Sequence, residues 1–189
     1  LRQFYIANTS NKKVYLKPII SGTNILFTIE SGNCNIEGWM ERANLKCPCC
    51  GGITQNEILK EQFKLRKTKD RLLVVIYNSS NGKEYRLPTE QEILIPFSIK
   101  PTNKPSETLP QNDSQNLKIT LWGFPTWGDM FSSRQLLAIN TLISKLDEIK
   151  NNCHITDIEY KKVIITYLGI LINRITPRTN MFGLWNVIG

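Results

Sequence analysis

The feature that most constrains this chain is a short cysteine-rich segment, residues 47–52, which reads C-P-C-C-G-G. Cys47 and Cys50 have the C-x-x-C spacing of a zinc knuckle, in which Pro and Gly let the backbone turn tightly enough for two thiolates to bind one metal ion. A structural zinc ion takes four ligands arranged as a tetrahedron. The knuckle therefore supplies half of a zinc site, and two ligands have to come from elsewhere.

The missing ligands have two alternative sources. Cys34, Cys153 or His154 could approach the knuckle in the folded chain, because zinc accepts both thiolate and imidazole ligands. Alternatively, a second knuckle lies outside this polypeptide, and the 189 residues are a piece of a larger protein. The chain starts at Leu1 rather than Met, which agrees with a fragment and equally with processing.

Composition predicts a globular protein of one or two domains. The hydrophobic fraction of 41% is enough for a core. The longest apolar stretch, residues 163–172, is about half of the roughly 20 residues that cross a bilayer, so no membrane partner is expected. Five cysteines in no regular pattern favour reduced thiols in the cytoplasm over disulfides.

The formal net charge of +8 predicts a surface that attracts anions. Nucleic acid is the commonest large anionic partner of such a chain, because each phosphate neutralised by Lys or Arg releases counterions. Solubility alone explains the same charge. The net charge does not separate these two interpretations.

Two β-hairpins are predicted, one on each side of the knuckle, as in zinc ribbons. Their strands are rich in β-branched and aromatic residues, and short polar turns separate them. The segment between the knuckle and the second hairpin, residues 56–71, is polar with apolar residues in partly helical spacing. The expected strands are residues 14–20, 25–30, 72–77 and 83–87, with turns at residues 21–24 and 78–82.

The last part of the chain is predicted to form two long helices. Ser132 and Gln135 have the capping-box spacing, and an amphipathic helix follows with apolar residues on one face. Thr156 and Glu159 repeat the spacing, and the second helix is apolar nearly all round before it ends ahead of Pro177. The two helices are expected to pack antiparallel. Because a hairpin alone cannot cover the second one, we expect another surface to lie against it, and residues absent from this chain are one source of such a surface.

These patterns predict an α+β fold with a zinc-ribbon-like β-hairpin domain followed by a helical hairpin domain. The first domain is expected at residues 1–100. Residues 101–116 contain three prolines among polar residues and are expected to form a linker or mobile loop. Residues 117–189 are expected to form the helical domain, with an aromatic loop and the two long helices.

Two clusters are candidates for nucleic-acid contact, and each has a structural alternative. A basic run follows the knuckle, as in zinc ribbons that present such segments to phosphates, although most charge runs are simply solvated. Residues 121–131 place four large aromatic side chains among Gly and Pro, where they could stack on bases or anchor the loop to a core. The basic run comprises Lys60, Lys64, Arg66, Lys67, Lys69 and Arg71.

Motifs give little support to independent catalysis. The neighbours Cys153 and His154 could suggest a thiol nucleophile and its base, but adjacent side chains rarely face each other, and an exposed loop is the better explanation. The sequence contains no G-x-x-x-x-G-K-[ST], G-x-S-x-G or G-x-G-x-x-G. No catalytic residue is assigned to this chain.

Several blocks together resemble one protein family. ERANLKCPCCGG, KTKDRLLVVIYNSSNGKEYRLPT, WGDMFSSRQLLAINTLISKL, YLGILINRI and FGLWN look like the central region of the large adenine-specific DNA methylases that contain a zinc ribbon. Order and spacing match over most of the chain, including Trp185 and Asn186. Residues 178–181 depart from the family pattern, because this chain has R-T-N-M where relatives carry Y-N-S-S. No role of that stretch carries over.

The resemblance implies a parent enzyme that transfers a methyl group from S-adenosylmethionine to the exocyclic amine of adenine in DNA. In that family a Gly-rich cofactor motif and a first C-P-x-C knuckle precede this region, and the catalytic D-P-P-Y motif follows it. Cys47 and Cys50 would then close a four-cysteine zinc site with a pair outside this chain, leaving Cys49 as a spacer. Its partners would be DNA and the remainder of the methyltransferase.

Under this interpretation the chain is the insert that engages DNA. The basic run would contact phosphates, and a loop near the substrate would be shaped by Trp127, Asp129, Phe131 and Arg134. The alternatives are a stand-alone zinc-ribbon module that binds nucleic acid or protein, and a purely structural insert whose charge serves solubility.

Overall fold

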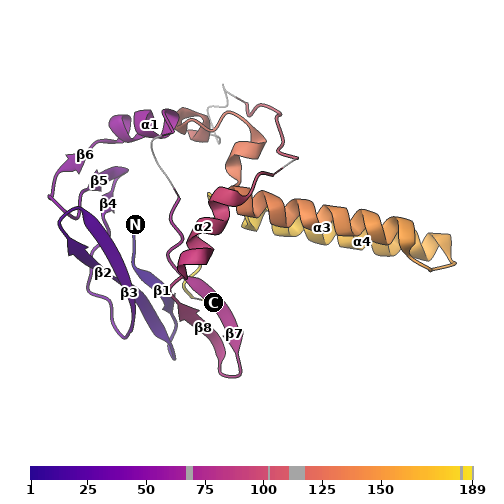
Figure 1. Ribbon diagram of the computed structural model, residues 1–189, viewed down its shortest axis with the longest axis horizontal. Coiled ribbons are helices and arrows are strands. Elements are labelled where there is room, and N and C mark those ends of the chain that lie inside the picture. Colours follow the sequence, from indigo (N-terminus) through magenta and orange to yellow (C-terminus); the bar gives the residue numbers. More distant parts are fainter. Residues whose placement is uncertain (67–69, 102, 111–117, 184, 189) are drawn as a thin grey trace. The chain divides into compact units, whose positions relative to one another are not determined.

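The computed structural model describes residues 1–66, 70–101, 103–110, 118–183 and 185–188 (Figure 1). The fold is mixed α+β, with small antiparallel sheets and several helices. The chain forms two compact units. The first consists of Leu1–Ile93, Leu121–Gly123 and Leu184–Gly189, and the second of Leu94–Thr120 and Phe124–Gly183.

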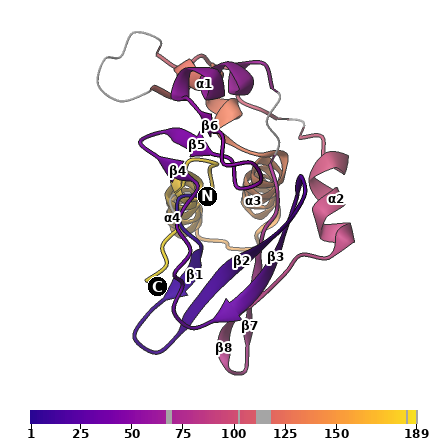
Figure 2. The same ribbon diagram turned by 90° about the vertical axis from the view of Figure 1, so that its left-hand side faces the viewer.

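The main sheet of the first unit has the order β1-β2-β3 and is antiparallel (Figure 2). Strand β1 spans Tyr5–Asn8, β2 spans Lys13–Ser21 and β3 spans Asn24–Ser31. The predicted hairpin is confirmed, with each strand slightly longer than expected. Its turn needs Gly22, which has a φ of +59°, a left-handed conformation that costs other residues energy.

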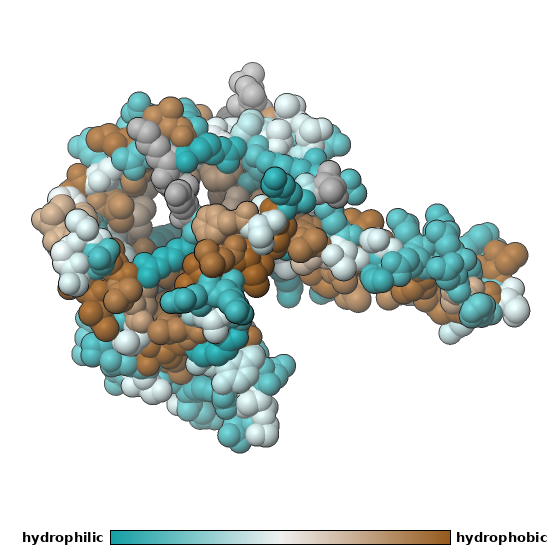
Figure 3. Space-filling view, in the orientation of Figure 1, coloured by the Kyte–Doolittle hydropathy of each residue, from teal (hydrophilic) through white to brown (hydrophobic). Residues whose placement is uncertain are grey.

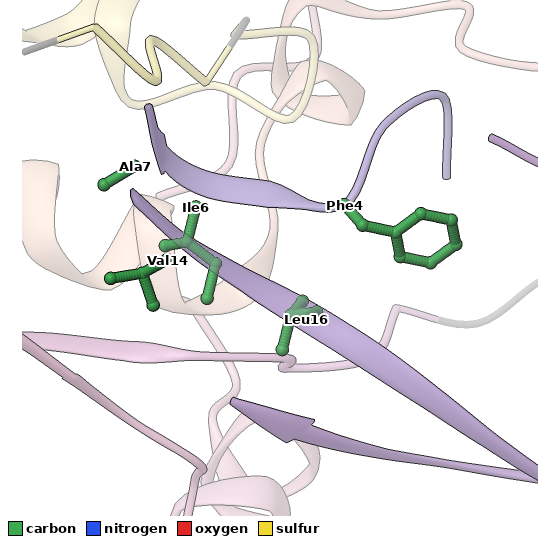
Figure 4. Packing of buried hydrophobic residues seen from close by; sticks show 5 residues of the cluster. All are labelled: Phe4, Ile6, Ala7, Val14 and Leu16. Carbon is green, nitrogen blue, oxygen red and sulfur yellow. The ribbon is translucent and has the colours of Figure 1, made fainter. Parts of the chain in front are cut away.

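The core of the first unit lies against β1 and β2. Alternate residues of β2 point inward because side chains of a strand alternate between its two faces. Trp39 adds an edge-on contact, with its ring centre 5.1 Å from that of Phe4. The buried cluster consists of Phe4, Ile6, Ala7, Val14 and Leu16 (Figure 4).

The second hairpin is shorter than predicted. Strand β7 spans Val75–Ser79 and β8 spans Gly82–Arg86. Leu73 and Val74, expected in the strand, precede it and pack against the core cluster. The turn is also tighter than the five residues predicted, because Ser79 pairs directly with Gly82 and Asn81 N–H donates to Ser79 Oγ over 3.0 Å.

A third small sheet surrounds the knuckle. It has the order β4-β5-β6, with β4 at Met40–Glu41, β5 at Asn44–Lys46 and β6 at Ile53–Thr54. Helix α1, Asn56–Lys64, begins directly after β6. The expected partly helical segment is thus a helix of 9 residues that ends well before residue 71.

Helix α2, Glu90–Ser98, was not predicted. Its start nevertheless has the capping-box pattern. Thr89 N–H donates to Glu92 Oε2 over 2.9 Å, and Glu92 N–H donates to Thr89 Oγ1 over 3.3 Å. The residues T-E-Q-E therefore carried a helix-start signal.

The second unit contains the predicted helical hairpin. Helix α3 spans Ser133–Asn152 and α4 spans Ile158–Ile175, and the two lie side by side (Figures 1 and 2). The capping box of Ser132 and Gln135 is confirmed. Short 3-10 helices η1 (Lys118–Trp122), η2 (Trp127–Met130) and η3 (Thr176–Arg178) flank the hairpin in the sequence.

One expectation about α4 is wrong. Its N-cap is Asp157 rather than Thr156, and the Asp157 carboxylate accepts from the N–H groups of Glu159 and Tyr160, both at 3.0 Å. A carboxylate suits this position because the helix N-terminus is electropositive. None of the residues of α4 is buried, which agrees with the expectation that the hairpin alone cannot cover this helix. No helix within the described residues has the length and apolar character needed to cross a membrane.

Candidate nucleic-acid interface and cysteine knuckle

The knuckle is a closed loop between β5 and β6. Cys47 N–H donates to the Gly52 carbonyl over 2.7 Å, and Gly51 N–H donates to the Cys47 carbonyl over 2.8 Å. Gly51 has a φ of +73°, which only glycine adopts without strain. The Gly-Gly pair therefore allows a backbone turn that is tight enough for the thiols to lie close to one another.

The thiols of the knuckle differ in acidity. Backbone N–H groups of Cys50 and Cys49 point at the Cys47 sulfur and lower its pKa, because they stabilise the thiolate more than the thiol. Burial, together with the charge of Cys47, raises the pKa of Cys49. The Cys47 thiol thus loses its proton more readily, which suits a thiolate ligand, whereas Cys49 favours the neutral thiol.

Cys47 and Cys50 fit half of a zinc site. Within the described ranges, no group of three or more His, Cys, Asp or Glu side chains could hold a metal ion. Cys34 instead packs against the core cluster, and Cys153 caps the end of α3. The structure does not bring Cys34, Cys153 or the exposed His154 into a metal-binding group, so the first proposed source of ligands is unsupported.

Helix α1 carries the first basic residues of the run. Lys60 and Lys64 are one helical turn apart and lie on the same side of the helix. Lys60 Nζ lies 5.8 Å from the centre of the Trp122 ring, within range of a cation–π interaction. Phe63 contacts the same ring edge-on, at 5.4 Å between ring centres and an interplanar angle of 84°.

Three contacts fix the position of α1. Leu59 is buried, with 6% of its surface exposed. Asn56 N–H donates to Asn44 Oδ1 over 3.1 Å, which ties the start of the helix to the sheet that holds the knuckle. At the other end, a Cβ on Gly123 would lie 2.7 Å from Lys64 Cα, so only glycine allows this close approach.

The remaining residues of the basic run have different positions. Arg66 follows α1 in a left-handed conformation, with a φ of 53°. Arg71 turns to the main sheet, where its Nη1 donates to the Ile25 carbonyl over 2.7 Å and its guanidinium lies 5.3 Å from the centre of the Phe27 ring. Lys67 and Lys69 lie outside the described residues. Among the described residues of the run, Arg71 therefore has a different role from Lys60 and Lys64, which lie on α1.

The aromatic loop of the second unit is built around a buried carboxylate. Lys104 Nζ lies 2.7 Å from Asp129 Oδ1, and Thr126 Oγ1 donates to Asp129 Oδ2 over 2.7 Å. Burial raises the pKa of Asp129, but the bonds from Lys104 and Thr126 outweigh it and lower the pKa to about 2. Asp129 therefore fixes the loop, with its oxygens already engaged.

The other loop residues divide into anchors and exposed groups. Phe124 is buried and packs edge-on against Phe182, at 5.0 Å between ring centres. Trp127 is 45% exposed, and Phe131 is half-buried. Arg134 is exposed and lines an apolar groove of α3 together with Leu137. Both expected roles of the aromatic loop thus have candidates: Phe124 anchors it, and Trp127 is available for contact.

Sequence reasoning missed Trp122 as a partner of the basic helix. The Lys60–Trp122 contact joins positions far apart in the chain, and no local pattern reports such a pair. No protein-family model matches the chain, and no curated protein or solved structure matches it. Function is therefore inferred from this geometry and from the resemblance of the sequence blocks.

Proposed function

We propose that the chain engages DNA through α1 and the turn that follows it. The observation that supports this most directly is the placement of Lys60 and Lys64 on a short helix tied to the knuckle sheet by Asn56 and to Trp122 by Lys60. A fixed helix presents its ammonium groups at a defined spacing. Lysines that serve only solubility do not need a helix that is held in place by contacts of this kind.

Phosphate contact is the chemistry that this surface can perform. Lys60 and Lys64 would act as point charges toward the DNA backbone, and the Arg66 guanidinium could bind a phosphate with two parallel hydrogen bonds. Contacts of this kind position a protein on DNA without reading sequence. Trp122 would keep the Lys60 side chain close to the helix surface rather than free in solvent.

We place this activity in a DNA adenine methyltransferase that uses S-adenosylmethionine, as the resemblance implies. The cofactor motif and the D-P-P-Y motif would belong to other parts of that enzyme. In this chain, Cys47 and Cys50 would hold zinc together with ligands from outside it. The ion pair of Lys104 and Asp129 would stabilise the loop that displays Trp127 to a base turned out of the duplex.

A stand-alone zinc-ribbon module that binds nucleic acid or protein is the second candidate. It is favoured by the fact that the knuckle, its sheet and α1 belong to one compact unit. A module would bind DNA without any other protein, and its loss would leave methylation unchanged. The methyltransferase role instead predicts that the same substitutions lower methyl transfer by the parent enzyme.

A binding titration with matched variants tests the proposal. The first variant combines Lys60→Ala, Lys64→Ala and Arg66→Ala, and the control combines Lys145→Ala, Lys150→Ala and Lys162→Ala on the helical hairpin. Both remove three positive charges. Fluorescence anisotropy with a labelled duplex at low salt should show affinity lowered about tenfold or more for the first variant and by about twofold at most for the control.

Equal losses in the two variants would mean that only net charge matters, and would contradict the proposal. Circular dichroism of both variants checks that the fold is kept.

A further inference from the structure

Helix α4 has two apolar faces, and α3 occupies only one of them. The half-buried residues Ile164, Ile165, Leu168 and Ile172 recur at intervals of three and four. Gly169 lies on the same side, since a Cβ there would be 3.9 Å from Leu146 Cδ2 of α3. This face is accounted for by the helical hairpin itself.

The second face forms an exposed stripe. Its exposed fractions are 58% for Tyr160, 49% for Val163, 70% for Tyr167, 55% for Ile170 and 53% for Leu171. Figure 3 shows apolar side chains, in brown, along the helical hairpin. Tyr160, Val163, Tyr167 and Ile170 have the spacing of the a and d positions of heptads, the pattern by which one helix packs against another, and Leu171 lies at the neighbouring e position. A soluble helix that is apolar on both faces is unusual unless a partner covers the second face.

We infer that this stripe packs against the same stripe of a second copy of the chain, with the two α4 helices antiparallel. A two-fold axis through Tyr167 would place Val163 of each copy opposite Leu171 of the other, because both lie four residues from Tyr167. Tyr160 would face Arg174, since both lie seven residues away. Val163 and Leu171 would thus form the same apolar contact on each side of the axis, as a two-fold interface requires.

The available area is close to what a stable pair needs. The exposed fractions of the five side chains correspond to roughly 550 Å² per chain, or about 1,100 Å² in a symmetric pair, and specific interfaces begin near 1,200 Å². Polar residues at the rim would supply the remainder. The two hairpins would together form a four-helix bundle, in which each α4 is covered on both sides.

The charges at the ends of α4 favour the antiparallel arrangement. Glu159 lies in the first turn and Arg174 in the last. Antiparallel packing brings Glu159 of each copy, which also pairs with Lys162 of its own helix at 2.7 Å, near Arg174 of the other copy, whereas parallel packing would place like charges together. The side chain of Arg174 is exposed and could also lie over the Tyr160 ring.

Sedimentation velocity of the whole chain, without DNA, tests this inference. We expect a concentration-dependent species of twice the 21.7 kDa chain mass at micromolar concentrations. Tyr167→Glu should abolish it, because two carboxylates would meet at the symmetry axis. Leu26→Glu, at a residue of β3 that is 58% exposed, is the matched control and should leave the dimer intact.

A second variant tests the geometry. In Tyr167→Cys, mild oxidation should link position 167 of the two copies, and peptide mass spectrometry distinguishes this disulfide from those of the native cysteines. Ile143→Cys, at an exposed position of α3, should not form the corresponding link. A wild-type chain that stays monomeric, a dimer that survives Tyr167→Glu, or equal linkage at positions 143 and 167 would overturn the inference.

Discussion

The ammonium group of Lys60 lies 5.8 Å from the centre of the Trp122 ring, which at the same time receives Phe63 edge-on. The Trp122 segment belongs to the same compact unit as the knuckle, although Leu94–Thr120, which lies between them in the sequence, belongs to the second unit. This contact makes the position of the basic helix depend on a distant part of the chain.

Trp122→Ala should lower the free energy of unfolding by about 2 kcal/mol, because it removes the aromatic partner of Phe63 and opens a cavity beside α1. Trp122→Phe keeps an edge-on ring contact and should cost about half as much. Urea denaturation followed by circular dichroism gives both values. Equal costs for Ala and Phe would show that the ring contact is not what stabilises the helix.

Gly123→Ala should both destabilise the chain and weaken DNA binding. The new Cβ would meet the backbone of Lys64, and the φ of +85° is strained for alanine. Gly22→Ala is the matched control, since it has a φ of +59° but nothing within 4 Å of its Cβ. We expect the control to lose about 1 kcal/mol of stability and no DNA affinity. Unchanged DNA affinity in Gly123→Ala would argue against a link between this loop and the basic helix.

Asp129 should make stability depend on acid pH. Its pKa is lowered from 3.8 to about 2 in the folded chain, so its stabilising contribution is complete above about pH 4 and is lost as the pH falls toward 2. We expect the Asp129 carboxylate to contribute about 1 to 2 kcal/mol to the free energy of unfolding. This is less than the pKa shift alone implies, because Lys104 is half exposed and solvent screens the ion pair. Thermal unfolding of wild type and Asp129→Asn should differ at pH 6 and converge near pH 2. A constant difference over this range would refute the role of the carboxylate charge.

Cys47 should react with iodoacetamide faster than Cys49 at neutral pH. The backbone N–H groups that lower the pKa of Cys47 raise its thiolate fraction, whereas burial and the neighbouring sulfur act in the opposite direction on Cys49. Mass spectrometry of the knuckle peptide after short labelling times gives the order. Zinc binding to Cys47 and Cys50 should protect both sites, with Cys153 as the internal control.

Local sequence patterns correctly predicted the helices and strands that are stabilised by interactions between neighbouring residues. The alternation along β2 and the capping box of Ser132 and Gln135 each identify an element from a few neighbouring residues. Asp157 was missed because two capping residues stand side by side, and the carboxylate makes the bonds that a hydroxyl was expected to make. The start of β7 was misplaced because Leu73 and Val74 have strand composition but pack against the core instead of pairing.

The candidate site was only partly predictable, because it depends on long-range contacts. The sequence identified Lys60 and Lys64 but not their support by Trp122 and Gly123. It grouped Arg71 with them on the basis of proximity in the chain, whereas the fold turns Arg71 toward Ile25. Asp129 was expected near a substrate, and its burial with Lys104 could not be predicted from the loop sequence alone.

The salt dependence of DNA binding tests the central proposal most directly. If Lys60, Lys64 and Arg66 each neutralise a phosphate, the slope of log Kobs against log salt concentration should become shallower by about 2.7 when all three are replaced by Ala, since each contact contributes about 0.9. The triple variant of Lys145, Lys150 and Lys162 should keep the wild-type slope. Wild-type slopes in both variants, or equal decreases in both, would contradict DNA engagement through α1.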